Sequence, residues 1–338
     1  MRARRPRAGL RGWGGVGATA VVCALVPALA LLLPRTPPHP ADGPAPGGRK
    51  AAHGTRVTAD ACQDGEAHHQ SLFPSSADGP TLAAIRARGH VAVGVDQDSY
   101  RWGYRNPNNP TGELEGFDID LAHRIAEDIL GDRNKVRFKA IPTNERISAI
   151  RSGRVDMVVR TMTITCDRLK DVAFSAPYFL TGQQVLAPKT SKITGYDASL
   201  AGRKICSAAG STAHDRLSAD KKNGRLPAST DISTTVPNQL DCLVKLQLGE
   251  VDAVVTDSAL AAGQAAQDPT VELKGKSFTR EFYGVAMKRG ADDLVRRVNR
   301  TLENYREDGG WKASYDTWLS ATLGRDSSSA VPPTANYR

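Results

Sequence analysis

The segment 160–187 carries the side chains best suited to chemistry. An apolar strand pattern at 155–159 runs into a polar cluster that contains Thr161, Thr163 and Arg168. Hydroxyl and backbone N–H groups donate to the lone pairs of an anion, and arginine adds a planar pair of donors. The cluster therefore predicts a site for a small anion such as a carboxylate.

The spacing T-x-T-x-x-x-x-R, followed by F-S-x-P-Y at 174–178, resembles a known family. Its members are the amino-acid-binding extracytoplasmic solute receptors that serve ABC importers. The resemblance covers roughly residues 60–323 and is greatest to the actinobacterial glutamate/glutamine-binding subgroup. It implies a two-lobed periplasmic-binding-protein-like fold that closes on an amino acid and catalyses nothing.

The resemblance assigns the ligand's carboxylate to two segments. Arg168, with Thr161 and Thr163, is expected to hold it from one lobe; the alternative for Arg168 is a solvated surface ion pair. Ser211 and Thr212 open a helix after a glycine, where free N–H groups bind anions. The family has G-S/T-T at this point, which gives Thr212 the carboxylate from the second lobe. An ordinary N-cap is the alternative.

The remaining candidates contact the ammonium group or the side chain. Asp257 follows an apolar strand and is either an N-cap or, as the resemblance implies, the partner of the ammonium. Asp96, Tyr100 and Trp102 follow the first strand, where a ring would pack on the ligand's carbon chain; both rings have core packing as the alternative. Many relatives have a small residue in place of Arg160. A second arginine suits a side-chain carboxylate and favours glutamate or aspartate, unless it faces outward.

Signals for catalysis are poor. The sequence contains no G-x-S-x-G, P-loop or H-E-x-x-H motif and no Cys–His pair in a shared motif. We expect no catalytic residue, metal or cofactor. A small-acid dehydratase on the same fold stays open, because an acidic base is not recognisable from spacing alone.

The expected partner is an ABC permease and the expected state is a monomer. The alternative partner is a signalling membrane protein, since the resembling subgroup is associated with a sensor that regulates a Ser/Thr kinase of glutamate metabolism. The net charge of +9 does not indicate nucleic-acid binding. Residues 1–50 hold eight Lys/Arg and one acid, a charge of +7, which leaves +2 for residues 51–338.

The basic residues surround an apolar run at 16–33, preceded by five arginines. This pattern places the rest of the chain outside the cytoplasm. Segment 1–33 is a signal peptide or an anchor. We favour a membrane tether, with a secreted form as the alternative, because Leu31 and its apolar neighbours follow the small residues of a possible cleavage site at 28–30.

Four cysteines lie beyond the apolar run, Cys62, Cys166, Cys206 and Cys242. An even count in an oxidising compartment favours two disulfides, with three possible connectivities. We expect Cys206–Cys242 and Cys62–Cys166. The alternative is four unpaired, buried thiols.

The elements that position these residues alternate along the chain as in a mostly parallel α/β sheet with helices on both faces. Strands are expected at 91–95, 136–141, 155–159, 203–207, 251–255 and 282–288, and helices at 82–88 with Thr81 as cap, 117–130, 146–151, 240–248, 292–305 and 311–319. Lobe 1 is expected to comprise 81–184 and 280–323, lobe 2 185–279, with hinge strands near 180–188 and 278–286, a flexible spacer at 34–80 and a disordered tail at 324–338.

Overall fold

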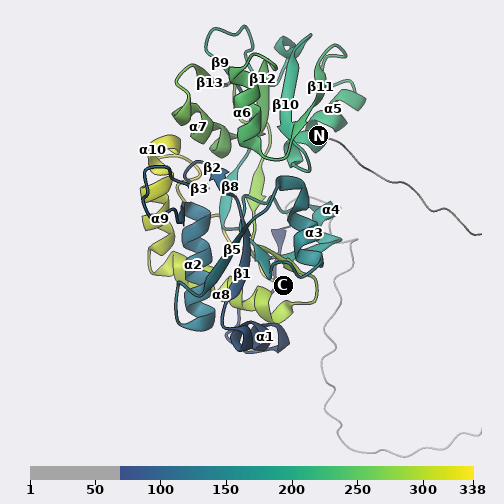
Figure 1. The fold of residues 1–338 in the computed structure, drawn as a ribbon. Coiled ribbons are helices and arrows are strands. Elements are labelled where there is room, and N and C mark those ends of the chain that lie inside the picture. The colour runs from purple at the N-terminus through teal and green to yellow at the C-terminus, as the bar shows by residue number, and fades with distance from the viewer. Residues whose placement is uncertain (1–68) are drawn as a thin grey trace, which may run out of the picture. The chain divides into compact units, whose positions relative to one another are not determined.

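The computed structural model describes residues 69–338, which form two five-stranded β-sheets flanked by helices and joined by two further strands (Figure 1). This arrangement confirms the expected two-lobed α/β fold. The apolar run at 16–33 and Cys62 lie outside the described residues. Within 69–338, none of the helices combines the length and the apolar character needed to span a bilayer.

Lobe 1 is built on a mixed sheet in the order β5-β1-β6-β15-β7. Its elements are α1 (Pro80–Arg88), β1 (Val91–Val95), β2 (Asp98–Ser99), β3 (Gly103–Arg105), β4 (Leu114–Glu115), α2 (Phe117–Leu130), β5 (Val136–Ala140), the 3-10 turn η3 (Thr143–Glu145), α3 (Arg146–Arg151), β6 (Met157–Val158), α4 (Cys166–Leu169), β7 (Val172–Phe174), β15 (Ala286–Lys288), α8 (Asp292–Glu307), α9 (Gly310–Trp318) and α10 (Ser320–Leu323). β1 runs parallel to β5 and β6, whereas β15 runs antiparallel to β6 and β7, so the strand pairings of the sheet are mixed and not, as expected, mostly parallel. Met157 shares a core with α2 and α8, and its neighbour Val158 shares the opposite core with α3, as strand alternation requires.

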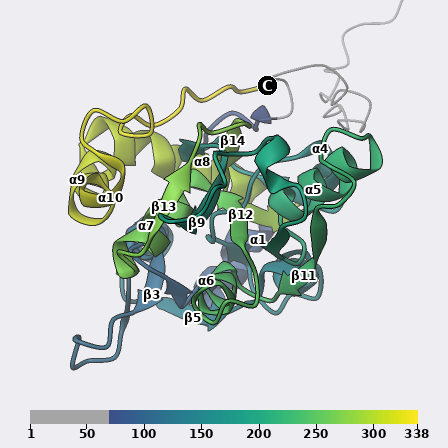
Figure 2. The same cartoon turned by 90° about the horizontal axis from the view of Figure 1, so that it is seen from above.

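Lobe 2 has a second mixed sheet in the order β11-β10-β12-β9-β13. Its elements are β9 (Gln183–Pro188), the 3-10 turn η4 (Ala198–Leu200), β10 (Lys204–Ala208), α5 (Thr212–Lys222), β11 (Asp231–Val236), α6 (Gln239–Gln247), β12 (Ala253–Asp257), α7 (Ser258–Gln267) and β13 (Val271–Lys274). Val255 packs with α5 on one face, and Val254 packs with α6 and α7 on the other. Figure 2 shows these helices around β12.

Two short strands connect the lobes. β8 (Phe179–Thr181) and β14 (Glu281–Tyr283) pair antiparallel, with Tyr283 opposite Phe179. The chain therefore passes from one lobe to the other twice, as expected, and this strand pair is the hinge (Figure 1). The buried rings of Phe179 and Tyr283 stack with their centroids 5.9 Å apart, which anchors the hinge in the core of lobe 1.

One helix start differs from expectation. Thr81 was predicted to cap the first helix, but the helix already begins at Pro80, whose fixed φ suits the first turn. The N-cap Gly79 offers no side chain, and the Leu82 N–H donates instead to the Asp293 carboxylate at 2.9 Å. A carboxylate from a distant helix thus replaces the local cap.

The prediction of a disordered tail at 324–338 is wrong. Its main chain pairs with the first described residues, where Ser71 and Tyr337 form a parallel bridge. The Ser329 hydroxyl donates to the carbonyl oxygen of Leu180 in β8 at 2.7 Å. Main-chain hydrogen bonds therefore order a segment whose composition is poor in apolar residues.

The end of the predicted spacer is also packed. The Ser71 hydroxyl donates to the Phe174 carbonyl oxygen at 2.9 Å, and the His69 ring stacks on Phe282 of β14 at 4.3 Å. Both ends of the described chain thus contact the hinge strands.

Candidate functional site

Polar residues from both lobes line one pocket of about 340 Å³, part of which is open to solvent. Lobe 1 contributes η3, the start of α3, the segment after β6, and α4. Lobe 2 contributes the end of β10, the first turn of α5 and the junction of β12 with α7, so strand ends supply much of the wall. The lining residues are Thr143, Arg146, Arg160, Thr161, Thr163, Arg168, Ala208, Ser211, Thr212, Ala213, Gln239, Thr256, Asp257 and Leu260.

Seven of the ten candidates from the sequence line this pocket. They are Arg160, Thr161, Thr163, Arg168, Ser211, Thr212 and Asp257. Tyr100 and Trp102 line a second pocket that shares Gln239 and Leu260 with the first, and Asp96 lines neither.

Arg168 is buried and faces the pocket. Its Nη1 donates to the Thr163 carbonyl oxygen at 2.7 Å, and its Nη2 donates across the lobes to the Gly210 carbonyl oxygen at 3.1 Å. Its side chain therefore bonds only to main-chain oxygens among the described residues, and burial lowers the pKa of the guanidinium. The surface ion pair considered for Arg168 is not what the structure has.

Thr161 is held in an unusual backbone conformation. Its φ is +41°, in the left-handed region that β-branched residues rarely adopt. Its N–H donates to Asp118 Oδ2 at 3.0 Å, and the Tyr178 hydroxyl donates to Asp118 Oδ1 at 2.9 Å. Burial raises the pKa of Asp118 to about 7. The tyrosine of the F-S-x-P-Y motif thus supports the pocket wall through a buried acid.

Arg160 points inward, but its charge is already paired. Its Nη2 lies 2.8 Å from Asp96 Oδ2, and its Nη atoms also donate to Thr143 Oγ1 and Asn238 Oδ1, each at 2.9 Å. Only its Nε lacks a partner among the described residues. The expected cation for a ligand side chain is therefore corrected to an internal ion pair with a residue 64 positions earlier in the sequence.

Arg146 is the charged residue of this pocket that sequence reasoning missed, because it was taken only as the start of a helix. Its guanidinium donates to the carbonyl oxygens of Thr143, Arg160, Thr161 and Gly210 at 2.9–3.4 Å. Burial, followed by the charges of the two other pocket arginines, pushes its pKa well below the usual range. A cation at a helix N-terminus opposes the helix dipole, and this conflict was the available signal.

Asp257 faces the same pocket from lobe 2. It occupies the N-cap position of α7, yet its side chain makes no cap bond. The Tyr283 hydroxyl from the hinge donates to its Oδ2. Burial, and then the charge of Glu281, raises the pKa of this carboxyl. Asp257 therefore does not cap α7 with its side chain.

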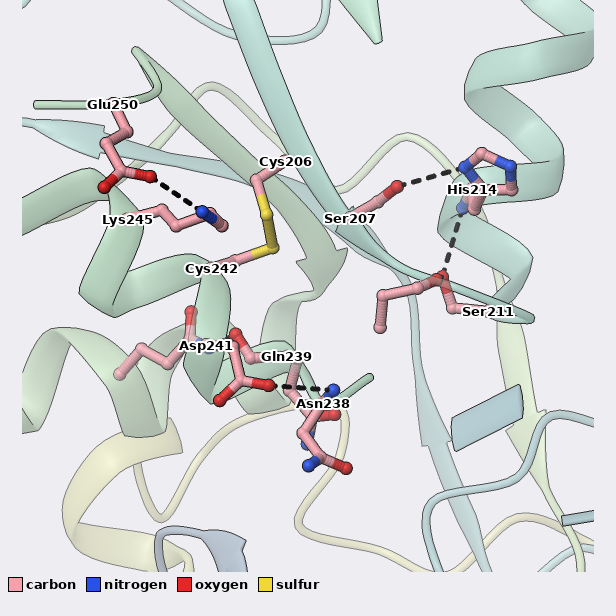
Figure 3. Close-up of a disulfide and its surroundings, with 12 residues drawn as sticks. Cys206, Ser207, Ser211, His214, Asn238, Gln239, Asp241, Cys242, Lys245 and Glu250 are labelled. Atoms are coloured by element: carbon pink, nitrogen blue, oxygen red, sulfur yellow. Dashed lines mark hydrogen bonds and ion pairs between the residues drawn. A yellow bond between two sulfur atoms is a disulfide. The ribbon is translucent and has the colours of Figure 1, made fainter. Parts of the chain in front are cut away.

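The two candidates at the N-terminus of α5, Ser211 and Thr212, make different contacts. The Ser211 hydroxyl donates to the Ala208 carbonyl oxygen at 2.6 Å and accepts the His214 N–H at 3.1 Å, so it is an N-cap as well as a lining residue (Figure 3). The Thr212 hydroxyl donates to the Glu281 carboxylate in the hinge at 3.2 Å.

The two aromatic candidates have different surroundings. Trp102 is 1% exposed and packs edge-on against Phe117, Phe179 and Tyr283, which is the core role considered for it. Tyr100 is half-buried at the second pocket.

The Cys206–Cys242 disulfide expected from the sequence is present and joins β10 to α6 (Figure 3). It fixes the helix whose first turn meets lobe 1, where Gln239 Nε2 lies 3.2 Å from Asp96 Oδ2. The Cys62–Cys166 bridge stays a prediction, because Cys62 lies outside the described residues.

Two lobes, a pair of hinge strands and a polar pocket between the lobes define a two-lobed solute-binding protein. Residues 91–321 match the bacterial extracellular solute-binding proteins, family 3. The chain belongs to this family.

Named relatives share most of their length with it. The ABC transporter glutamine-binding protein GlnH of Bacillus subtilis is 38% identical over 239 residues, which cover 71% of this chain and 84% of the relative. The glutamate-binding protein GluB of Corynebacterium efficiens is 30% identical over 282 residues, covering 80% and 87%. The solved structure of an ancestral arginine-binding protein bound to glutamine is 35% identical, covers 69% of this chain and 98% of its own, and has a TM-score of 0.62.

Proposed function

We propose that this protein is an extracytoplasmic receptor that binds an acidic amino acid or its amide (glutamate, aspartate, glutamine or asparagine) between its lobes. One observation carries the proposal. The pocket presents a buried guanidinium, Arg168, bonded only to main-chain oxygens, and a buried carboxyl, Asp257, held by a tyrosine hydroxyl. The carboxylate and ammonium of an α-amino acid complement these two groups.

The roles follow from the contacts. Arg168 and Arg146 both donate to the Gly210 carbonyl oxygen, so their charges converge at one point of the pocket. A buried charge without a charged partner is costly, and the α-carboxylate supplies that partner. Thr163 adds its hydroxyl, Thr212 adds its main-chain N–H at the start of α5, and Asp257 takes the ammonium.

The relatives support the ligand class and the partner. GlnH is named for glutamine and an ABC transporter, and GluB is named for glutamate. We therefore propose delivery to an ABC permease by a monomeric receptor tethered to the membrane through residues 1–33. A signalling membrane protein as the partner and a dehydratase activity are the competing proposals, and neither has a described residue that favours it.

Calorimetric titration of the full-length chain with each of the twenty amino acids tests the proposal. Binding is expected for the four named ligands and not for their decarboxylated amines, which lack the group that Arg168 holds. Absence of binding by every amino acid would contradict it. Recovery of the bound ligand unchanged, checked by mass spectrometry after long incubation, separates a receptor from a dehydratase.

A further inference from the structure

The second pocket adjoins the proposed amino-acid site. It is a partly open depression that spans about 220 Å³ when the adjoining solvent is included, and it shares Gln239 and Leu260 with the first pocket. Its apolar wall includes Tyr100 and Leu240. Because the two pockets share lining residues, the side chain of a ligand whose head lies in the first can extend toward the second.

One buried side chain of this pocket is incompletely bonded. Gln264 is 4% exposed, and its Nε2 donates to the Gln239 carbonyl oxygen at 2.7 Å. That bond fixes the orientation of the amide, because a carbonyl oxygen accepts only from the nitrogen. The Gln264 Oε1 atom is left without a hydrogen-bond partner among the described residues. A buried acceptor without a donor destabilises the protein and attracts a ligand that supplies one.

Asp98 is a second acceptor of the pocket, whose other polar lining residues are Ser99, Gln239 and Gln267. The main-chain N–H of Asp98 donates to Asp96, whereas its carboxylate makes no hydrogen bond within residues 69–338. Burial, and then the nearby charges of Asp96 and Asp241, raises the pKa of Asp98 against a smaller opposing effect of Arg160.

Cations that could offset these acceptors are engaged elsewhere. The residues that line the second pocket include no lysine or arginine. The Arg101 guanidinium lies over the Tyr100 ring but donates to the carbonyl oxygen of Trp318. Arg160 is paired with Asp96. A carboxylate in this pocket would meet the like charge of Asp98 and no lysine or arginine among the lining residues.

We propose that the second pocket is the side-chain subsite and that Gln264 and Asp98 select an α-amino acid whose side chain ends in N–H donors. The amide of glutamine fits this requirement, and the carboxylate of glutamate does not. The inference rests on the proposed function. It narrows the four proposed ligands to glutamine and asparagine, and it makes Gln264 and Asp98, rather than Arg160, the source of selectivity.

The first arm of the test titrates the full-length wild type with glutamine, asparagine, glutamate, arginine and norvaline, which has a side chain of similar length without the amide. Glutamine is expected to bind at least about tenfold more tightly than glutamate and norvaline, the effect of one hydrogen bond to a charged group. Tightest binding by arginine would support the acceptor subsite with a cationic occupant. Glutamate binding as tightly as glutamine would overturn the inference and leave the proposed function intact, whereas no binding by any ligand would remove both.

The second arm uses variants. Asp98→Asn breaks no side-chain hydrogen bond within residues 69–338, so this variant should fold. Gln264→Met removes the buried acceptor. Each is expected to weaken glutamine about tenfold and to leave norvaline unchanged. Glu113→Gln removes the same charge from an exposed side chain of a nearby loop and should change nothing. Equal weakening of glutamine and norvaline by both variants would show that the two residues only support the fold.

Discussion

The guanidinium of Arg160 and the carboxylate of Asp96 form an ion pair at 2.8 Å in which both side chains are almost fully buried, 1% and 6% exposed. Asp96 also accepts the Ser99 hydroxyl at 2.7 Å. Such a pair contributes little net stability when intact, but loss of one partner leaves a buried charge at a cost of about 3–5 kcal/mol.

We therefore expect Arg160→Met and Asp96→Leu each to lower the free energy of unfolding by about 3–5 kcal/mol, and the double variant to lose clearly less than the sum. Urea unfolding measures all three. Additive losses would show that the two residues do not interact. In ligand titrations, Arg160→Met should weaken glutamate and glutamine equally, and selective loss of glutamate would restore Arg160 as a ligand-facing cation.

Arg168→Ala should abolish binding of every amino acid while the protein still folds. Removing one partner of a buried, hydrogen-bonded charge pair costs on the order of 2–5 kcal/mol, enough to lose a micromolar ligand. Calorimetry measures the affinity, and Arg151→Ala on an exposed stretch of α3 is the matched control. Unchanged affinity in Arg168→Ala would exclude the proposed site.

Affinity should depend on pH through Asp257. Burial and Glu281 raise its pKa in the empty pocket, and a bound ammonium would lower it again. Below the raised pKa the carboxyl must release a proton before it pairs with the ligand, so affinity falls as pH decreases. Calorimetry in two buffers of different ionisation enthalpy should detect the released proton. A pH-independent affinity and no proton release would argue against Asp257 as the ammonium partner.

Asp118 should make the folded protein less stable as pH rises. Its pKa is about 7 in the folded state against an ordinary value of 3.8, so the folded state holds a proton that the unfolded state has lost between these pH values. Each pH unit in that interval is worth about 1.4 kcal/mol, giving a loss on the order of 4 kcal/mol between pH 4 and 7. Asp118→Asn should remove this component. Parallel stability curves of variant and wild type would refute the assignment.

Replacing both Cys206 and Cys242 with alanine should lower the free energy of unfolding by roughly 3–4 kcal/mol, given a sequence separation of 36 in the chain-entropy model. Denaturant unfolding with and without reductant checks this value. Intact mass tests the second predicted bridge: two disulfides remove four hydrogens from the chain. A loss of two would leave Cys62 and Cys166 unpaired with each other.

Much of the fold was predictable because its signals are local. Leu121, Ile125 and Ile129 recur at a spacing of four, and all three are buried on α2. The apolar runs that end in Thr161 and Asp257 place polar groups at strand ends, where the pocket lies. The disulfide followed from two cysteines near the middle of the chain. The order of the tail at 324–338 could not be predicted in this way, because it depends on main-chain bonds to Ser71 that composition does not encode.

The site was harder to predict because its details depend on contacts between distant residues. The guanidinium groups of Arg146 and Arg168 both donate to the carbonyl oxygen of Gly210, which lies in the other lobe. Asp96 comes next to Arg160 only when the chain folds. From the sequence, Arg160 therefore indicated a cation for a ligand. Gln264 belongs to no sequence motif, and it stands out only because its Oε1 atom has no hydrogen-bond partner among the described residues.

The contact of both ends of the described residues with the hinge has a mechanical consequence. His69 lies on β14, and Ser329 bonds to β8. When one lobe swings against the other about these strands, points near the pivot travel least and the rims of the lobes travel farthest. A receptor held by its pivot can close on a ligand without pulling on its attachment, so a tether of any length leaves the closing motion free.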